Sequence, residues 1–558
     1  MTLVSRKFYN VSLPYRFCEL SWNCCPRSGF RLLTLPPPEL PFTEFTKDLH
    51  IFPCFKKTLK QSWSHKQLCP CKPGSEVHKY ITTDEFSKVI DNSVCLHGIH
   101  VHTYNCAAYR FLLSQLRARK PIKSLTINLS KEFFEIANSQ TVLKQVRNLC
   151  ELSIAFRWER ASDSHVSSFN TVWELVALNS PTLRSLDLGF VESMEGYDIA
   201  HDWQSPISSG QWPTRSQPLQ LNELRIFQYA GLAADFKVTH FFTPETLTTS
   251  SLVDSQGFDD VFLELAKENR LPNLKALELC RSTSKISNMC RIVEHLPPLE
   301  VLSLTSFRHG YHEDSGDWFA FGYLDGHKEN LRVLWLDVWP RAFKDLSSDV
   351  DKPSTWRKIY KPDLDNPFDF SDYPNLRELA LPETFDELEE VIPAPQLQKL
   401  RSLQERSSTR SQTLNYKEPF KKTSASLFKI IGDRQIALKA RQAYQSQSES
   451  VPPAGSAIAS NNPILPSLSV LIDGEMFIGA YGNIDVPKIC RAEYLPLKQK
   501  GKGTEAPTEF KTILKLVPAR KFWRYWPDCC LFGHARGPWA WIGRPFPNGR
   551  HTGMDWVV

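Results

Sequence analysis

The residue types best suited to bind a metal ion gather in one early stretch of this 558-residue chain. Zinc is usually held by cysteine and histidine, and structural zinc sites show paired cysteines with about two to four residues between them. The stretch offers a single Cys-x-Cys, formed by Cys69 and Cys71. The other candidates are Cys95, His97, His100, His102 and Cys106. Because this spacing does not match a zinc site, we predict no bound metal and expect packed or surface side chains.

The chain carries no sequence motif of a common catalytic type. It has no glycine-rich phosphate loop, no Gly-x-Ser-x-Gly turn, no His-Glu-x-x-His and no kinase catalytic phrase. Acidic pairs occur at Asp259–Asp260 and Glu389–Glu390, but adjacent carboxylates usually face solvent, whereas a catalytic pair must converge across a cleft. We therefore predict that the protein is not an enzyme and has no cofactor. An enzyme within residues 461–558 is the alternative that stays open.

Composition and charge indicate a soluble protein of the cytoplasm or nucleus. Apolar residues make up 41% and charged residues 23% of the chain, which is ordinary for a folded domain. The formal charge of +6 is spread without a dense Lys/Arg block, so we predict no nucleic-acid partner. No stretch approaches the ~20 apolar residues of a membrane span. The polar, basic start lacks a secretory core, so the 14 cysteines indicate reduced thiols.

The elements that position these side chains follow from a short phrase that recurs along the chain. The phrase is an apolar residue, two others, Leu, one other, then Leu or Ile. Its copies begin at Ile122, Leu149, Leu183, Leu221, Leu274, Leu299, Leu331 and Leu376, with a fainter copy at Leu465. Because side chains alternate along a strand, the fourth and sixth positions point into one core. Each copy therefore predicts a short buried strand.

Several copies are preceded by a turn and a helix-like segment. Proline with a small or polar partner stands before the strand, as in Pro272-Asn273 and Pro374-Asn375, and such pairs end a helix and turn the chain. Helix-like segments cover residues 171–178, 258–268 and 286–295. Helix, turn and strand together make one unit of a solenoid. A single ordinary α/β domain is the alternative interpretation.

These phrases resemble the leucine-rich-repeat family, in the irregular form of fungal F-box proteins. The distance between copies varies from 25 residues (Leu274 to Leu299) to 53 residues (Leu221 to Leu274), and most of the distances exceed the ~20–29 residues of regular repeats. The resemblance implies an α/β solenoid with a parallel sheet on its concave side and helices with long loops on its convex side. We expect this solenoid over residues 21–403.

Residues 1–17 resemble the last helix of an F-box, whose usual phrase matches the residues from Leu3 to Tyr9. The resemblance implies that this segment contacts a Skp-type adaptor, which a cullin joins. The candidate contact residues are Leu3, Val4, Phe8, Tyr9, Leu13 and Pro14. The Leu-Pro phrase that opens an F-box is missing upstream, which puts adaptor binding in question. The alternative for residues 1–20 is an amphipathic helix that caps the first repeat.

The later part of the chain changes composition. Residues 404–462 are rich in Ser, Gln, Arg and Lys, and predict a helix followed by a flexible linker. Residues 463–558 predict a last repeat and a tail dense in Trp and Pro. This tail is either a cap on the open end of the solenoid or a patch that binds a partner.

A stacked parallel sheet offers its concave side to a partner protein. The side chains expected there lie between and after the core leucines: Asp187, Arg225, Phe227, Glu278, Trp335 and Asp337. Aromatic residues and Arg dominate interface energetics, although an isolated Trp on such a sheet is often only packed beneath a loop. The sequence thus predicts a protein-binding subunit, which the family resemblance makes the substrate receptor of an F-box-type ubiquitin ligase. The alternative is a leucine-rich-repeat scaffold without a ligase.

Overall fold

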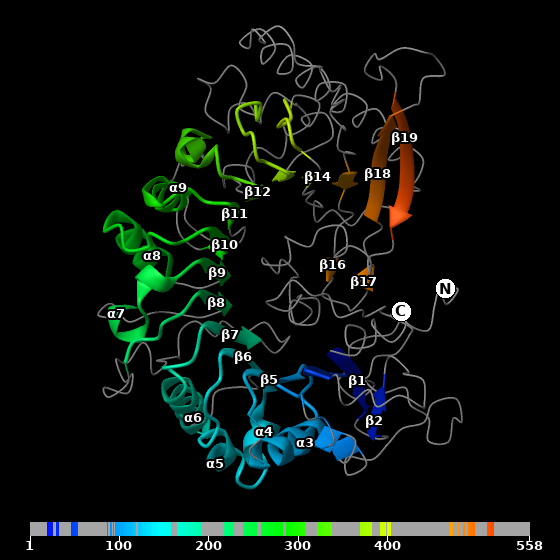
Figure 1. Cartoon of the computed structure of the whole chain (residues 1–558), viewed down its shortest axis with the longest axis vertical. Coiled ribbons are helices and arrows are strands. Elements are labelled where there is room, and N and C mark those ends of the chain that lie inside the picture. The colour runs from blue at the N-terminus through cyan, green and yellow to red at the C-terminus, as the bar shows by residue number, and fades with distance from the viewer. Residues whose placement is uncertain are drawn as a thin grey trace, which may run out of the picture. The chain divides into compact units, whose positions relative to one another are not determined.

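The chain divides into two compact units, and Figure 1 labels many of their helices and strands. Unit 1 comprises Met1–Val261, Ile478–Ile484 and Trp526–Val558, and unit 2 comprises Phe262–Phe477 and Asp485–Tyr525. The computed structural model describes residues 19–25, 29–32, 46–53, 86–87, 90–91, 93, 95–118, 121–157, 164–191, 217–227, 238–253, 258–282, 286–306, 321–337, 369–381, 391–397, 399–402, 469–472, 477–478, 484–485, 489–496 and 510–517. The F-box-like segment, the 404–462 linker and the Trp-rich end lie outside these residues.

Strands of unit 1 pair in the order in which they follow one another along the chain. They are β1 (Glu19–Cys25), β2 (Gly29–Leu32), β3 (Asp48–Pro53), β4 (Gly98–Val101), β5 (Ser124–Leu129), β6 (Glu151–Arg157), β7 (Ser185–Val191), β8 (Glu223–Phe227) and β9 (Thr249–Val253). Strand β1 pairs in parallel with β3, and each strand from β3 to β9 pairs in parallel with the next. Strand β2 runs antiparallel to β1.

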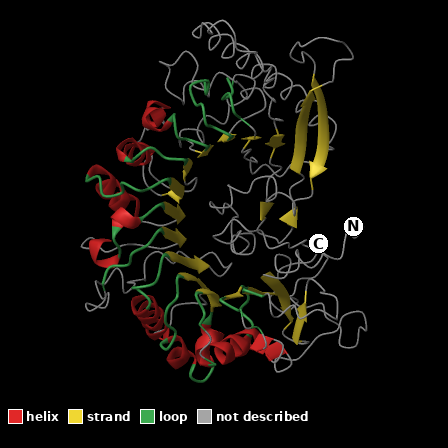
Figure 2. Ribbon diagram, in the orientation of Figure 1, coloured by secondary structure: helices red, strands yellow, loops and turns green. Residues whose placement is uncertain are grey.

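Helices lie on one side of the unit 1 strands, as Figure 2 shows. They are α3 (Cys106–Arg117), α4 (Lys131–Glu135), α5 (Ser139–Leu143), α6 (Ser164–Leu178), α7 (Val238–Phe241) and the 3-10 helix η4 (Pro244–Thr246). Helix α8 (Phe258–Lys267) contains the point at which unit 1 gives way to unit 2. Asn105 caps α3, since its side chain accepts a hydrogen bond from the Ala107 N–H at 2.8 Å.

Unit 2 repeats the same arrangement. Its strands are β10 (Ala276–Ser282), β11 (Val301–Ser306), β12 (Val333–Asp337), β13 (Glu378–Leu381), β14 (Lys399–Ser402), β15 (Ser469–Ile472), β18 (Ile489–Pro496) and β19 (Phe510–Val517), with α9 (Ile286–His295) and the 3-10 helix η5 (Phe321–His327). Strands β10 to β15 are parallel and sequential, and β15, β18 and β19 are antiparallel. Two further short strands, β16 (Phe477–Ile478) and β17 (Ile484–Asp485), each have one residue in either unit.

The recurring leucine phrase forms the strands that the sequence predicts. The eight clear copies become β5 to β8 and β10 to β13, and the fainter copy overlaps β15. The core leucines align between strands, as in Leu152, Leu186 and Leu224, which are neighbours in register and at most 2% exposed. Burying each such side chain stabilises the fold by roughly 1.5–3 kcal/mol. The prediction of an α/β fold with a parallel sheet of sequential strands is confirmed, and the helices expected near residues 171, 258 and 286 are present.

A repeated hydrogen-bond pattern fixes the register between successive strands. The carbonyl of Cys150, just before β6, accepts two N–H donors at the start of β7, from Arg184 at 2.8 Å and Ser185 at 3.1 Å. The Arg184 carbonyl in turn accepts from the N–H groups of Asn222, just before β8, and Glu223, its first residue. In unit 2 the carbonyl of Glu300 receives the same pair from the start of β12. Each repeat therefore positions the next, so side chains at equivalent positions line up across the sheet.

Candidate protein-binding surface

The face of the unit 1 sheet opposite the buried leucines carries two rows of side chains, and we call it the strand face. Alternation along each strand places these residues away from the core. In register order, the first row holds Asp48, Gly98, Ser124, Glu151, Ser185, Glu223 and Thr249, and the second row holds His50, His100, Thr126, Ser153, Asp187, Arg225 and Ser251. Polar side chains therefore occupy nearly every one of these positions from β3 to β9.

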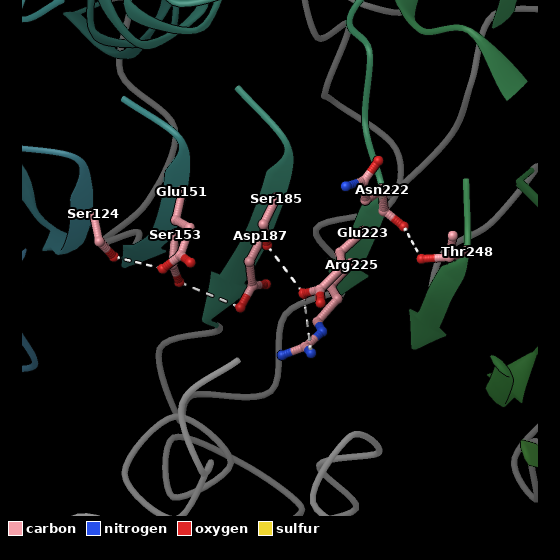
Figure 3. Close-up of polar contacts among 9 residues, drawn as sticks. All are labelled: Ser124, Glu151, Ser153, Ser185, Asp187, Asn222, Glu223, Arg225 and Thr248. Atoms are coloured by element: carbon pink, nitrogen blue, oxygen red, sulfur yellow. Dashed lines mark hydrogen bonds and ion pairs between the residues drawn. The ribbon is translucent and has the colours of Figure 1, made fainter. Parts of the chain in front are cut away.

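Hydroxyl groups on alternate strands hold the glutamates of the first row (Figure 3). Ser124 on β5 donates a hydrogen bond to Glu151 Oε2 on β6 at 2.8 Å, and Ser185 on β7 donates to Glu223 Oε2 on β8 at 3.2 Å. Both glutamates are partly exposed. A small hydroxyl residue beside each glutamate thus orients the carboxylate along the sheet instead of leaving it to move freely in solvent.

The second row carries an acid and a base on neighbouring strands. Ser153 Oγ donates to Asp187 Oδ2 at 3.3 Å, and Arg225 Nη2 lies 3.6 Å from Glu223 Oε2 in the first row (Figure 3). Asp187 and Arg225 face each other in register and are 8% and 5% exposed. Between β6 and β8 the two rows present three carboxylates and one guanidinium, so this part of the strand face is acidic.

Histidines fill the second row at the N-terminal end of unit 1. The rings of His50 on β3 and His100 on β4 stack with centroids 4.3 Å apart, and His102 stacks on His50 at 5.8 Å. Burial is the main cause that lowers the pKa of His50 well below its usual value and that of His102 to about 3, and the neighbouring imidazoles add repulsion. The surroundings therefore favour neutral rings at both positions.

His100 links the two rows through polar contacts. Its Nδ1 lies 2.8 Å from Thr126 Oγ1 on β5, and its Nε2 lies 3.7 Å from Asp48 Oδ1 in the first row. Gly98 makes the second contact possible, because a methyl group there would overlap the Asp48 carboxylate and lie 2.8 Å from His100 Nε2. The Asp48 side chain thus occupies the space that the absent Gly98 side chain leaves on β4.

The structure distributes the six sequence-predicted contact residues over the two units. Asp187, Arg225 and Phe227 lie in unit 1, where Phe227 on β8 is in register with Gly189 and Val253. Glu278, Trp335 and Asp337 lie in unit 2. Glu278 and Trp335 share one row through Ser303 and are 0% and 2% exposed. Asp337 is in register with Thr305. Their contact with a partner stays a prediction.

Sequence reasoning missed the residues that organise the strand face. Ser124, Glu151, Ser153, Ser185 and Glu223 all stand directly before or between the core positions of predicted strands. Their place in the phrase was a sufficient signal that they share a face with Asp187 and Arg225. The sequence alone did not reveal which hydroxyl group bonds to which carboxylate, because that depends on strand register. The candidate adaptor contacts, Leu3 to Pro14, lie outside the described residues.

The described residues contain neither a metal-binding cluster nor a membrane-spanning helix. Within the part of the chain that the structure describes, no group of three or more His, Cys, Asp or Glu side chains is arranged to hold a metal ion. No helix among these residues is long and apolar enough to cross a bilayer. Of the cysteines that were candidate metal ligands, Cys95 and Cys106 are free thiols, and Cys69 and Cys71 lie outside the described residues.

The chain matches no model of a known protein family and no curated protein sequence.

Proposed function

We propose that the protein binds an extended segment of another protein along the strand face of unit 1, and that it acts by binding and not by catalysis. The leucine-rich-repeat-like architecture suggests a protein-binding scaffold, since stacked repeats build long surfaces of this kind. The observation that carries the proposal is the ordered pair of polar rows between Ser124 and Arg225, with side chains oriented across neighbouring strands. Positions in each row repeat about every 4.8 Å, so the two rows form a continuous polar surface that crosses several strands.

Site-specific photocrosslinking tests this proposal. A benzoylphenylalanine replaces Ser185 on the strand face in one full-length protein and Arg110, exposed on α3, in a control. We expect a discrete crosslinked protein from position 185 that an excess of unlabelled wild-type chain competes away, and none from position 110. Equal crosslinking from both positions, or a strand-face product that the wild-type chain does not compete, would show that the strand face is not the binding surface.

A narrower form of the proposal makes the protein the substrate receptor of an F-box-type ubiquitin ligase. Its support is the resemblance of residues 1–17 to the end of an F-box, together with the repeat architecture that follows. The test is co-purification of the tagged chain with and without residues 1–17. Recovery of a Skp-type adaptor and a cullin with the full chain alone is the expected result. If neither protein recovers them, the binding function stands without the ligase.

A further inference from the structure

One strand-face cation lacks the hydrogen bonds that its burial would ordinarily require. The Arg225 side chain on β8 is only 6% exposed, and its ion pair is with Glu223, two residues earlier on the same strand. The distance of 3.6 Å between Arg225 Nη2 and Glu223 Oε2 is longer than a hydrogen bond. That carboxylate oxygen already accepts a hydrogen bond from Ser185 Oγ at 3.2 Å. Glu223 therefore neutralises part of the charge but does not satisfy the donors of the guanidinium.

The donors that stay unused lie on one edge of the guanidinium. Arg225 Nε and Nη2 are both buried and have no hydrogen-bond partner. These two N–H groups point the same way and form the side-on fork that binds the two oxygens of a carboxylate. Leaving buried charged donors without partners destabilises the folded chain. An edge that is buried, charged and matched to a planar anion is therefore suited to a ligand that arrives from outside the chain.

We propose that the Nε and Nη2 edge of Arg225 recognises a carboxylate of the bound partner. This inference rests on the proposed function and names the chemistry of its partner. Carboxylates fit better than phosphate groups here, because Asp187 faces Arg225 in register and Glu223 lies beside it, and a doubly charged anion would meet stronger repulsion than a singly charged one. The source of the carboxylate is either an Asp or Glu side chain or the C-terminus of the partner chain.

The burial of Arg225 also limits the shape of the partner. A guanidinium with 6% exposure is beyond the reach of a flat protein surface, so the carboxylate must stand on a side chain or chain end that reaches between the strand-face residues. A single extended segment meets this condition. The six intervals between β3 and β9 span about 29 Å at the usual strand spacing, so roughly twelve extended residues are more than enough to cross them.

The experiment uses the full chain and random peptides of about twelve residues as the probe. One pool carries a free C-terminal carboxylate and the other is amidated, and the peptides retained by immobilised wild-type protein are sequenced. The tightest peptide is then made with its acidic residue and with the matching amide, and Kd is measured for wild type, Arg225→Gln, Arg225→Lys and Arg110→Gln. Arg110 is an exposed arginine on α3 and serves as the charge-matched control.

We expect the wild-type protein to prefer the carboxylate form by about 10- to 100-fold, the size of a charge-assisted hydrogen-bond pair. Arg225→Gln should remove this preference, Arg225→Lys should restore part of it, and Arg110→Gln should leave it unchanged. Enrichment in both pools identifies a side-chain carboxylate, and enrichment in the free pool alone identifies a chain end. The urea midpoint of Arg225→Gln should not fall below that of wild type. If the only role of Arg225 were to stabilise the fold through its ion pair with Glu223, this substitution would lower the urea midpoint.

Three results would overturn the inference, and they are distinguishable. If wild type and Arg225→Gln show the same preference for the carboxylate peptide, Arg225 does not recognise the carboxylate, although the strand face still binds the peptide. If no peptide is retained and position 185 gives no crosslink, the proposed function fails and the inference fails with it. Crosslinking at position 185 without any carboxylate preference would reject the inference alone.

Discussion

Some repeats are joined by a single polar side chain, which forms hydrogen bonds to the backbone of the repeat before it. Asn179, at 0% exposure, accepts a hydrogen bond from Leu149 N at 2.9 Å and donates to Val146 O at 3.1 Å. His327 stands at the same place in unit 2, four residues before the first leucine of its strand phrase. Its Nδ1 accepts from Leu299 N at 3.0 Å and its Nε2 lies 2.9 Å from Val293 O. Burial lowers the pKa of His327, which favours the neutral ring that both bonds require.

Because Asn179 performs this task with a carboxamide, His327→Asn should be tolerated far better than His327→Leu. Leucine fills the space but leaves the Leu299 N–H and the Val293 carbonyl buried without their partner, at a cost of roughly 1–3 kcal/mol for each group. We expect urea unfolding to show a loss of several kcal/mol for His327→Leu and about half of it or less for His327→Asn. Equal losses would mean that ring volume, and not hydrogen bonding, is what matters at this position.

Gly98 provides a second test at the scale of one residue. Alanine at this position must displace the Asp48 carboxylate from its place beside His100, and because that side chain is partly exposed and free to turn away, we expect a loss of at most about 1 kcal/mol. Gly326→Ala is the matched control, since a methyl group there meets nothing within 4 Å. Thermal unfolding of both variants measures the difference. If Gly98→Ala is as stable as Gly326→Ala, the packing of Asp48 over Gly98 does not contribute to stability.

At the scale of whole elements, strand β9 belongs to the sheet although its sequence departs from the leucine phrase. The phrase runs Leu247, Ser250 and Leu252 there, with a serine in the second core position. That serine is 0% exposed, and its hydroxyl group has no hydrogen-bond partner. Strand β4 fits the phrase with Leu96, Ile99 and Val101. The leucine phrase does not predict either strand, because the fourth position, which is leucine in the eight clear copies, is Ile99 in β4 and Ser250 in β9.

The buried hydroxyl of Ser250 should therefore be dispensable. We expect Ser250→Ala to keep the stability of the protein or to raise it by about 1 kcal/mol, since it removes a polar group that lost its water without gaining a partner. Thr182→Val is the contrasting variant, because Thr182 Oγ1 donates to Leu149 O at 2.8 Å and its loss should cost about 1 kcal/mol. Chemical denaturation compares the two. A larger loss for Ser250→Ala than for Thr182→Val would contradict this account.

The sequence predicts the periodic parts of the structure well and the contacts between repeats poorly. Leucine spacing predicted β5 to β8 and β10 to β13, because each core position requires an apolar residue. The pairing of Ser124 with Glu151 and the stacking of His50 on His100 depend on which strands adjoin and on their register. The loops between repeats differ in length, so residues far apart in sequence meet without a fixed spacing. Strand-face chemistry is therefore visible only after the fold is known.

The histidines of β3 and β4 should make the stability of unit 1 sensitive to acid. Their folded pKa values are depressed, so below the ordinary value of about 6.5 the unfolded chain binds protons that the folded chain does not. Stability should therefore fall as the pH drops below about 6.5, by on the order of 1 kcal/mol per pH unit for His102 until its folded pKa of about 3, and His50 adds to the fall in the same direction.

Urea midpoints at pH 7 and pH 5 measure this effect. A variant with His50→Phe and His102→Phe keeps the aromatic stack but removes both titrating groups, while carboxylates such as Asp48 and the ring of His100 remain. We expect the wild-type protein to lose clearly more stability between the two pH values than the variant does. If both proteins lose the same stability between pH 7 and pH 5, the acid sensitivity comes from groups other than His50 and His102.

In the whole molecule, stability should be a sum over neighbouring repeats. Leu188 is 2% exposed at the centre of unit 1, in register with Ile154 on β6 and Ile226 on β8. Leu188→Ala should cost about 2–5 kcal/mol. Hydrogen exchange should then show the largest loss of protection in β6 to β8 and progressively less towards β3, with β12 in unit 2 least affected, because each repeat contacts mainly its neighbours. A uniform loss over all strands would instead indicate one cooperative core, as in an ordinary α/β domain.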